Sequence, residues 1–336
     1  MLYEVCLVGA TGAVGAEILR LLEERNFPVK TLRCFASPKS LGKSISFRGE
    51  KIPLEILKKG CLSTSRLVFF CAGSSISKEW IAEAGGYVVD SSSAFRSDPS
   101  VPLVIPEINA HALKNNPKIA ASPNCAATIL LMPLFKLHRL FQVKRIVVST
   151  YQAASGAGAW LLQELKNETL AHLEHRPYPH LLPFPYAFNL YPHNSKLQEN
   201  GYVEEEIKMR DETRKILEDE AIQLSATCVR VPVLRAHSVS ANVEFKKPFA
   251  LKMVYEALED VPGLKLFEDR AQNRFPTPFD ATGKDDVFCG RFRIDSSRPN
   301  TLEFWAVGDQ LLKGAALNAV QIAETALETQ NSEALL

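Results

Sequence analysis

The sequence predicts an α/β protein in which a doubly wound parallel sheet is joined to a second, α+β domain. Three observations support this fold class. Short β-rich runs alternate with helical patterns over roughly the first third of the chain, which is typical of a parallel sheet covered on both faces. A glycine-rich turn separates the first such run from the first helix. The chain has 336 residues, more than one simple core usually holds.

The elements of the first domain follow one another in a regular order. Residues 3–9 form an apolar run that we expect to be a buried strand, and residues 13–24 space their apolar side chains three and four apart, as in a helix. Further β-rich runs lie at 31–37, 66–73 and 87–93. A helical pattern at 77–85 lies between the last two of these runs. We place this domain at residues 1–125.

The remaining chain mixes both element types without regular alternation. Helical patterns are expected at 127–141, 160–173 and 204–217, and strands at 143–152, 227–234 and 238–245. A segment rich in Pro, Tyr, His and Asn at 176–200 is expected to be a long ordered loop. We assign 126–313 to the second domain, and we expect an alanine-rich helix at 314–330 to return to the first.

Composition narrows the possible partners and compartment. The net charge of +1 gives no strong field of one sign, so neither nucleic acid nor an anionic membrane is an expected partner. The chain shows no N-terminal signal and no apolar run of the roughly 20 residues that a membrane span needs. The number of cysteines, seven, is odd, and no CxxC pair occurs, which favours reduced thiols in the cytoplasm and no metal site.

The motif GATGAVG, residues 9–15, directly follows the first expected strand. Gly9 suits a tight turn, Gly12 a close approach of the backbone to a ligand, and Gly15 close packing of helix on strand. A cofactor pyrophosphate could then bind at the helix N-terminus. The alternative is a plain strand-to-helix turn.

The loop after the second strand, ASPKSLGKS at 36–44, contains no Asp or Glu to bind a ribose hydroxyl. It offers the hydroxyls of Ser37 and Ser40 and the cations of Lys39 and Lys43 instead. That chemistry fits a 2′-phosphate and favours NADP over NAD. The alternative is a solvated basic loop.

Cys125 follows a Pro-Asn turn signal and begins a helical pattern. The N–H groups and dipole of a helix N-terminus stabilise a thiolate, so Cys125 is a candidate nucleophile. His237, in the polar turn of RVPVLRAHS, is the best candidate for its proton-transfer partner. The alternative for Cys125 is a small buried hydrophobe, the interpretation that suits most of the other cysteines.

Charged residues in apolar surroundings form a second group of candidates. Arg96 and Arg230 each need an anionic partner, either a substrate group or an internal acid. Glu205 and Lys208 lie three apart and, by spacing alone, form only a charged helix face. His172 and His175 also lie three apart, but no third metal ligand at a suitable spacing accompanies them.

Taken together, these motifs resemble aspartate-β-semialdehyde dehydrogenase over nearly the whole chain. The resemblance includes GATGAVG at 9–15, SSSAFRSDPSVPLVIPEIN at 91–109, SPNCAAT at 122–128, STYQAASGAG at 149–158, EEEIKMRDETRKI at 204–216, RVPVLRAHS at 230–238, GKDDVFCGRFRID at 283–295 and GDQLLKGAALNAVQIAE at 308–324. The alternatives are N-acetyl-γ-glutamyl-phosphate reductase and a non-catalytic NADP-binding relative.

The resemblance implies a role for each matching position. Cys125 matches the nucleophile, His237 the acid–base histidine and Gln152 a residue that orients the substrate. Substrate contacts are implied for Arg96, Asn124 and Lys208 at the phosphate, Arg230 at the carboxylate and Glu205 at the amino group. Cofactor contacts are implied for Gly9, Ala10, Thr11, Gly12, Ala13, Val14, Ser37, Lys39, Ser40, Ser155, Gly156 and Gln310.

The implied protein is a Rossmann-type NADP-binding enzyme that reduces L-aspartyl 4-phosphate to L-aspartate 4-semialdehyde, acting as a homodimer or homotetramer. Three positions depart from the family pattern. Ser122 and Ala126 flank the Pro-Asn-Cys core where the family commonly has Asn and Ser or Thr, and Lys39 stands where it commonly has Arg. None of the three removes a reacting group.

Overall fold

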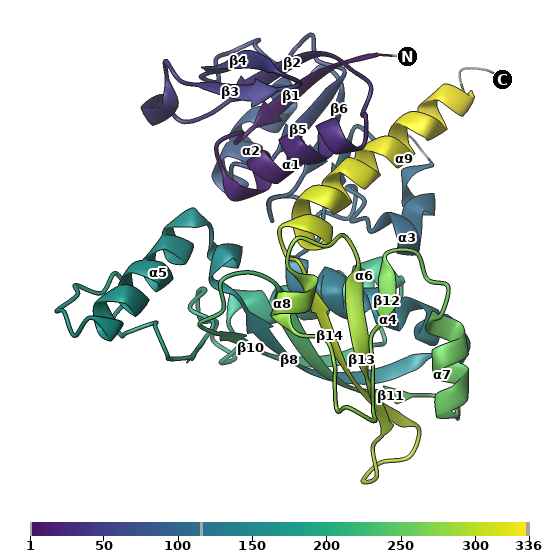
Figure 1. The fold of residues 1–336 in the computed structure, drawn as a ribbon. Coiled ribbons are helices and arrows are strands. Elements are labelled where there is room, and N and C mark those ends of the chain that lie inside the picture. The colour runs from purple at the N-terminus through teal and green to yellow at the C-terminus, as the bar shows by residue number, and fades with distance from the viewer. Residues whose placement is uncertain (1, 115–116, 334–336) are drawn as a thin grey trace. The chain divides into compact units, whose positions relative to one another are not determined.

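The computed structural model describes residues 2–114 and 117–333, and the chain divides into two compact units. The first unit contains the chain up to Asn124 together with the segment from Ala315 onward. The second unit is Cys125–Gly314. Figure 1 shows the elements of each unit.

The first unit is built on a sheet with the order β3-β4-β2-β1-β5-β6-β7. All neighbouring strands pair in parallel except β3 and β4, which form an antiparallel hairpin at one edge. The central strands are buried because both faces are covered, as their apolar sequences require. Its strands are β1 (Tyr3–Val8), β2 (Val29–Phe35), β3 (Ser44–Phe47), β4 (Glu50–Glu55), β5 (Leu67–Phe70), β6 (Tyr87–Asp90) and β7 (Ile119–Ala121).

The C-terminal helix α9 (Leu317–Glu333) packs against α1, α3 and β6 of this unit. Arg25 donates two hydrogen bonds, of 2.8 and 2.7 Å, to the Glu324 carboxylate, and Asn318 Nδ2 donates to Val104 O and Ser122 Oγ, both at 2.9 Å. The other helical segments are α1 (Ala13–Glu24), η1 (Pro38–Ser40), α2 (Ser74–Trp80), η2 (Ile81–Glu83), α3 (Pro106–Asn109) and η3 (Ala110–Leu113).

The second unit contains a mixed sheet with the order β12-β13-β14-β11-β8-β10-β9. The apolar helix α4 (Cys125–Phe141) packs on β8, β11, β13 and β14, and α6 (Glu204–Leu217) packs on β10. The strands are β8 (Val143–Gln152), β9 (Tyr191–Pro192), β10 (Gln223–Arg230), β11 (His237–Phe245), β12 (Leu264–Leu266), β13 (Val287–Ile294) and β14 (Thr301–Gly308). The other helical segments are η4 (Ala154–Ala157), α5 (Ala159–Leu173), α7 (Leu251–Leu258) and α8 (Pro278–Ala281), and η5 (Leu312–Ala316) begins in this unit and ends in the first.

The structure differs from the expected elements at several places. The hairpin of β3 and β4 falls where no strand was expected, and the loop 176–200 contains the two-residue strand β9. β10 ends at Arg230, not at residue 234, because Val231 to Ala236 form the turn that leads into β11. The segment at 312–316 is a π-helix, so the regular α9 begins only at Leu317.

Within residues 2–114 and 117–333, no helix is both long and apolar enough to cross a membrane.

Candidate active site

Three polar side chains meet where strands of the second unit end or begin. Gln152 is the last residue of β8 and Arg230 the last of β10, and the two pair directly in parallel register. His237 is the first residue of β11, which runs antiparallel to β8. Each is at most 3% exposed. At this end of the three adjacent strands, which we call the sheet edge below, an amide, a guanidinium and an imidazole therefore lie among apolar residues.

His237 is a buried, neutral imidazole. Its Nδ1 accepts a hydrogen bond from the Ala153 backbone N–H at 3.0 Å, which assigns the ring proton to Nε2. Burial lowers the pKa of His237 well below its usual value, and the positive charge of Arg230 lowers it further. The Nε2 atom has no hydrogen-bond partner in the described part of the chain. His237 thus holds a proton donor ready for a ligand atom.

Arg230 is fixed at both terminal nitrogens. Nη1 donates to Ala153 O at 2.9 Å, and Nη2 lies 2.8 Å from His193 Nε2. The buried Nε makes no well-aligned hydrogen bond within the described part of the chain. Burial raises the pKa of the neighbouring Tyr191 hydroxyl, and its interaction with the Arg230 guanidinium lowers this pKa in part. A buried guanidinium with an unused donor is suited to a carboxylate or phosphate ligand.

The start of helix α6 adds a charged pair to this edge. Gln152 Nε2 lies 3.3 Å from Glu205 Oε1 and 3.3 Å from Thr150 Oγ1. Glu205 is 7% exposed, and its carboxylate lies 3.8 Å from Lys208 Nζ. Glu205 and Lys208 therefore belong to the same cluster as Gln152, which their spacing in the sequence did not indicate.

Cys125 is the first residue of α4 and is partly exposed. It lies beside Gly314, where an added Cβ would come within 2.8 Å of Cys125 Cβ and 3.4 Å of Gln310 Cβ. By contrast, burial raises the pKa of Cys6 to about 11 and that of Cys34, Cys71 and Cys228 to about 12, so these thiols stay protonated at neutral pH. Its position at a helix start distinguishes Cys125 from these four cysteines, and its partial exposure distinguishes it from Cys6, Cys34 and Cys228.

The turn before His237 is held by Gln310. Ala236 has a φ of 71°, a conformation that alanine rarely adopts, and its N–H donates to Gln310 Oε1 at 2.8 Å. Gln310 Nε2 in turn donates to Ser155 Oγ at 2.5 Å. The Gln310 amide is thus used within the protein, and it supports the residue that precedes His237.

Gly156 lies directly against the imidazole. A Cβ added there would lie 2.7 Å from both Cε1 and Nε2 of His237 and 3.2 Å from Arg230 Nη1. Only glycine allows η4 to approach the two side chains this closely.

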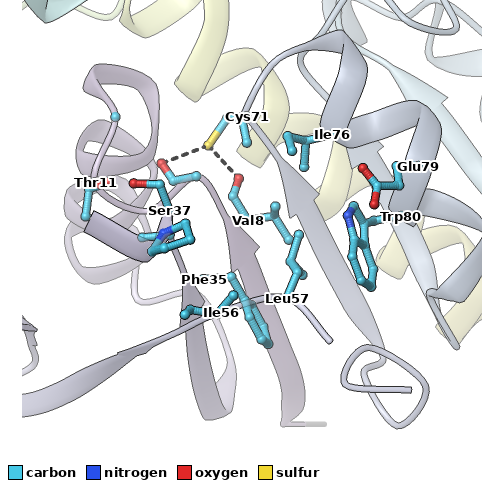
Figure 2. Close-up of a pocket in the computed structure, with 15 residues that line it drawn as sticks. Val8, Thr11, Phe35, Ser37, Ile56, Leu57, Cys71, Ile76, Glu79 and Trp80 are labelled. Carbon is cyan, nitrogen blue, oxygen red and sulfur yellow. Dashed lines mark hydrogen bonds between the residues drawn. The ribbon is translucent and has the colours of Figure 1, made fainter. Parts of the chain in front are cut away.

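The glycine turn lines a pocket of about 580 Å³ in the first unit. Figure 2 shows Thr11 and Ser37 on one side of this pocket and Glu79 and Trp80 on the other. Gly9 has a φ of 96°, and a Cβ there would lie 2.8 Å from the Cys71 carbonyl carbon. Gly12 precedes α1 without any side chain capping the helix. Uncapped helix N–H groups beside a pocket fit the phosphates of a dinucleotide.

The remaining cofactor residues predicted in the first unit lie on this turn and on the loop after β2. Gly9 to Val14 form the turn and the start of α1, and Lys39 and Ser40 lie on η1 directly after Ser37. Lys39 is exposed. A cationic side chain at this loop is compatible with a 2′-phosphate.

The first unit also contains Arg96 and Asn124. Arg96 Nε donates to Ser122 O at 2.9 Å, and Nη2 donates to Ser91 O at 3.0 Å. The loop that carries it is anchored by the buried carboxylate of Asp90, which accepts hydrogen bonds from Ser77 Oγ at 2.9 Å and from the N–H and hydroxyl of Ser92 at 3.0 and 2.9 Å. Asn124 is 6% exposed and immediately precedes Cys125 in the chain.

The predicted residues therefore form two groups. The second unit contains Cys125, Gln152, Ser155, Gly156, Glu205, Lys208, Arg230, His237 and Gln310, and the first unit contains the rest. Sequence reasoning missed His193, which contacts Arg230. Its only signal was a polar residue in a Pro-rich loop, and no spacing linked it to Arg230. Among the described residues, no three His, Cys, Asp or Glu side chains are placed to hold a metal ion.

Comparison with known proteins gives a consistent picture over both units. Residues 4–116 match the semialdehyde dehydrogenase NAD binding domain, and residues 131–313 match the semialdehyde dehydrogenase dimerisation domain. The aspartate-semialdehyde dehydrogenase of Synechocystis sp. is 52% identical over 328 residues, which cover 96% of this chain and 97% of the relative.

Solved structures agree with the sequence relatives. Aspartate semialdehyde dehydrogenase II from Vibrio cholerae, solved also in complex with ASA, has a TM-score of 0.93 and 39% identity, covering 98% of this chain and 99% of that one. The Candida albicans enzyme, solved with NADP, shares the fold with a TM-score of 0.77 at 22% identity, covering 98% of this chain and 99% of that one.

Proposed function

Because this chain belongs to the aspartate-semialdehyde dehydrogenase family, we propose that it carries out the family reaction with Cys125 as the covalent nucleophile. The reaction is the NADPH-dependent reductive dephosphorylation of L-aspartyl 4-phosphate to L-aspartate 4-semialdehyde. It belongs to the aspartate-family pathway, which supplies lysine and diaminopimelate, threonine and methionine. The observation that supports these roles most strongly is the meeting of Gln152, Arg230 and His237 at one sheet edge.

The first unit is the proposed NADP-binding domain. Gly9 to Val14 would hold the pyrophosphate at the start of α1, and Ser37, Lys39 and Ser40 would hold the 2′-phosphate. Ser155, Gly156 and Gln310 are further proposed cofactor contacts, which Ser155 and Gln310 would make in addition to the hydrogen bond between them. When bound, NADPH supplies the hydride that reduces the acyl carbon.

Cys125 begins the chemistry as a thiolate at the start of α4. Its sulfur attacks the acyl carbon of L-aspartyl 4-phosphate, the bond to the phosphate oxygen breaks, and a thioester on Cys125 remains. The Cys125 backbone N–H at the helix start is a candidate donor to the oxyanion. After reduction, the carbon–sulfur bond breaks, the aldehyde leaves and the thiolate is restored.

His237 handles protons through Nε2. Because the ring is neutral and Nδ1 accepts from Ala153 N–H, Nε2–H is the one proton that the ring can donate. It donates to the developing oxyanion and takes the proton back when the aldehyde forms. Burial keeps the ring neutral at rest, so the exchange involves one nitrogen only.

The substrate's charged groups suggest partners for the remaining residues. Arg230 would bind the carboxylate, and Glu205 would bind the ammonium group. Arg96, Asn124 and Lys208 would form the phosphate subsite, and Gln152 would orient the acyl group. The support is charge complementarity, together with the burial of Glu205 and Arg230.

The second unit is the proposed catalytic and dimerisation domain, in keeping with its match to a dimerisation domain. We propose a homodimer or a dimer of dimers that acts in the cytoplasm, without nucleic-acid or membrane partners. All seven cysteines are thiols, as a reducing compartment requires.

Phosphate-dependent reduction of NADP⁺ with L-aspartate semialdehyde tests the function, with N-acetyl-glutamate semialdehyde run in parallel. Turnover of the first aldehyde alone is the expected result. Preference for the second would favour N-acetyl-γ-glutamyl-phosphate reductase, and turnover of neither would favour a non-catalytic relative.

A further inference from the structure

His193 connects two residues that the proposed function places on opposite charges of the substrate. It follows β9 directly in the chain. Its Nε2 lies 2.8 Å from Arg230 Nη2, and its Nδ1 lies 3.1 Å from Ser195 Oγ. Ser195 Oγ also accepts a hydrogen bond from the Glu205 backbone N–H at 3.1 Å. A continuous chain therefore runs from Arg230 through His193 and Ser195 to the start of α6.

The protonation of this chain follows from its chemistry. Arginine only donates hydrogen bonds, so His193 Nε2 must carry a lone pair toward Nη2. Nδ1 lies 3.1 Å from Ser195 Oγ and 3.2 Å from the Ser195 backbone nitrogen. If Nδ1 accepted from that backbone N–H, the ring proton would be on Nε2 and would face the guanidinium, so the contact with Arg230 favours the tautomer in which Nδ1–H donates to Ser195 Oγ. A histidine doubly protonated here would turn an N–H toward the guanidinium and break the first link.

The surroundings of the ring favour the neutral form. Burial is the largest cause that lowers the pKa of His193, to about 4. The charges of Arg230 and Lys208 lower this pKa further, while Glu205 and Glu206 oppose them. At neutral pH the ring is therefore neutral, as an Nε2 lone pair facing Arg230 requires.

We propose that His193 is a positioning residue that fixes the distance and orientation between Arg230 and Glu205, and so sets recognition of the amino-acid end of the substrate. This inference rests on the proposed function. With Nη1 held by Ala153 O and Nη2 by His193, the guanidinium plane is fixed in the orientation in which it would meet a carboxylate. The link through Ser195 holds Glu205 in register with it.

The test compares His193→Ala, His193→Gln and Ser195→Ala in the phosphate-dependent assay. His193→Ala removes a hydrogen bond to a charged group, so the KM for L-aspartate semialdehyde should rise roughly 10- to 100-fold, while kcat and the KM for phosphate change little. His193→Gln should recover most of this loss, because its Oε1 accepts from Arg230 and its Nε2 donates to Ser195. Ser195→Ala should raise the same KM by a smaller factor. His175→Ala, on an exposed histidine after α5, is the matched control.

The outcomes separate this inference from the proposed function. A wild-type chain without phosphate-dependent turnover would refute the function itself. With an active wild type, an unchanged aldehyde KM in His193→Ala would overturn the positioning role. The positioning role would also be overturned if His193→Ala raised the KM for both aldehyde and phosphate and lowered kcat. The same holds if His193→Gln had an aldehyde KM no lower than that of His193→Ala, since each result indicates a merely structural side chain. Thermal unfolding of each variant identifies any that fail to fold. If a His193 variant fails, the aldehyde KM of Ser195→Ala relative to that of the wild type decides whether the positioning role holds.

Discussion

Replacing Gly156 by alanine should damage catalysis with a single methyl group. The new Cβ would lie 2.7 Å from two ring atoms of His237, whereas ordinary contact begins at 3.4 Å. The ring or η4 must therefore move by 3.4 − 2.7, or about 0.7 Å. His237 is fully buried and its Nδ1 is held by Ala153 N–H, so it cannot yield without losing that bond.

The displacement translates into a measurable loss. Misplacing a reacting group by about 1 Å can cost roughly 100-fold in rate, so kcat should fall by about one to two orders of magnitude. Overpacking should also lower the free energy of unfolding by about 1–3 kcal/mol.

The assay is initial-rate NADP⁺ reduction with saturating aldehyde and phosphate, together with urea unfolding. Gly49→Ala is the control, because that glycine has a φ of 81° and meets nothing within 4 Å. It should lose stability through backbone strain but keep kcat. A Gly156→Ala protein with wild-type kcat would refute the close packing of η4 on His237.

Three further results are expected. Arg230→Lys should lower kcat/KM by roughly 100-fold, because an ammonium cannot reproduce the planar fork or both contacts to Ala153 O and His193; near-normal kcat/KM would remove Arg230 from substrate binding. Lys39→Ala should raise the KM for NADPH about 10-fold and leave the KM for NADH unchanged, because only NADPH carries the 2′-phosphate. Equal effects on the two KM values would argue against a contact between Lys39 and that phosphate. The pKa values of His193 and His237 in the folded state lie below the ordinary 6.5, so their contribution to the free energy of unfolding is fully present above pH 6.5 and is lost as the pH falls toward 4. His193→Gln should therefore make the denaturation midpoint depend less steeply on pH in this range. A pH dependence equal to that of the wild type would contradict a buried neutral His193.

Local signals in the sequence predicted local structure well. The helix expected at 13–24 has those bounds in the structure, and the preceding strand ends within one residue of the prediction. Apolar periodicity and a glycine turn are sufficient there, because each depends on neighbouring residues. The hairpin of β3 and β4 was missed because its two strands, at an edge of the sheet, are short and Pro53 lies within the second, so their alternation of polar and apolar residues is a weak signal.

The site was predictable only in part, because it depends on register between distant strands. Arg230 lies opposite Gln152 because of the register in which β10 pairs with β8, and no local pattern in the sequence indicates that register. The sequence pattern alone left Glu205 and Lys208 as surface charges, and only the family resemblance moved them to the site. His193 reaches Arg230 through the two-residue strand β9, which no periodicity could indicate. The roles of all these residues stay predictions until they are tested.

The central claim is that Cys125 forms a thioester with the substrate. The most direct measurement is mass spectrometry of the intact and digested protein after brief mixing with L-aspartyl 4-phosphate in the absence of NADPH. The account predicts one aspartyl adduct, confined to the peptide that contains Cys125, absent from Cys125→Ser and released when NADPH is added. An adduct on another cysteine, or a Cys125→Ser protein that still turns over at the wild-type rate, would contradict it.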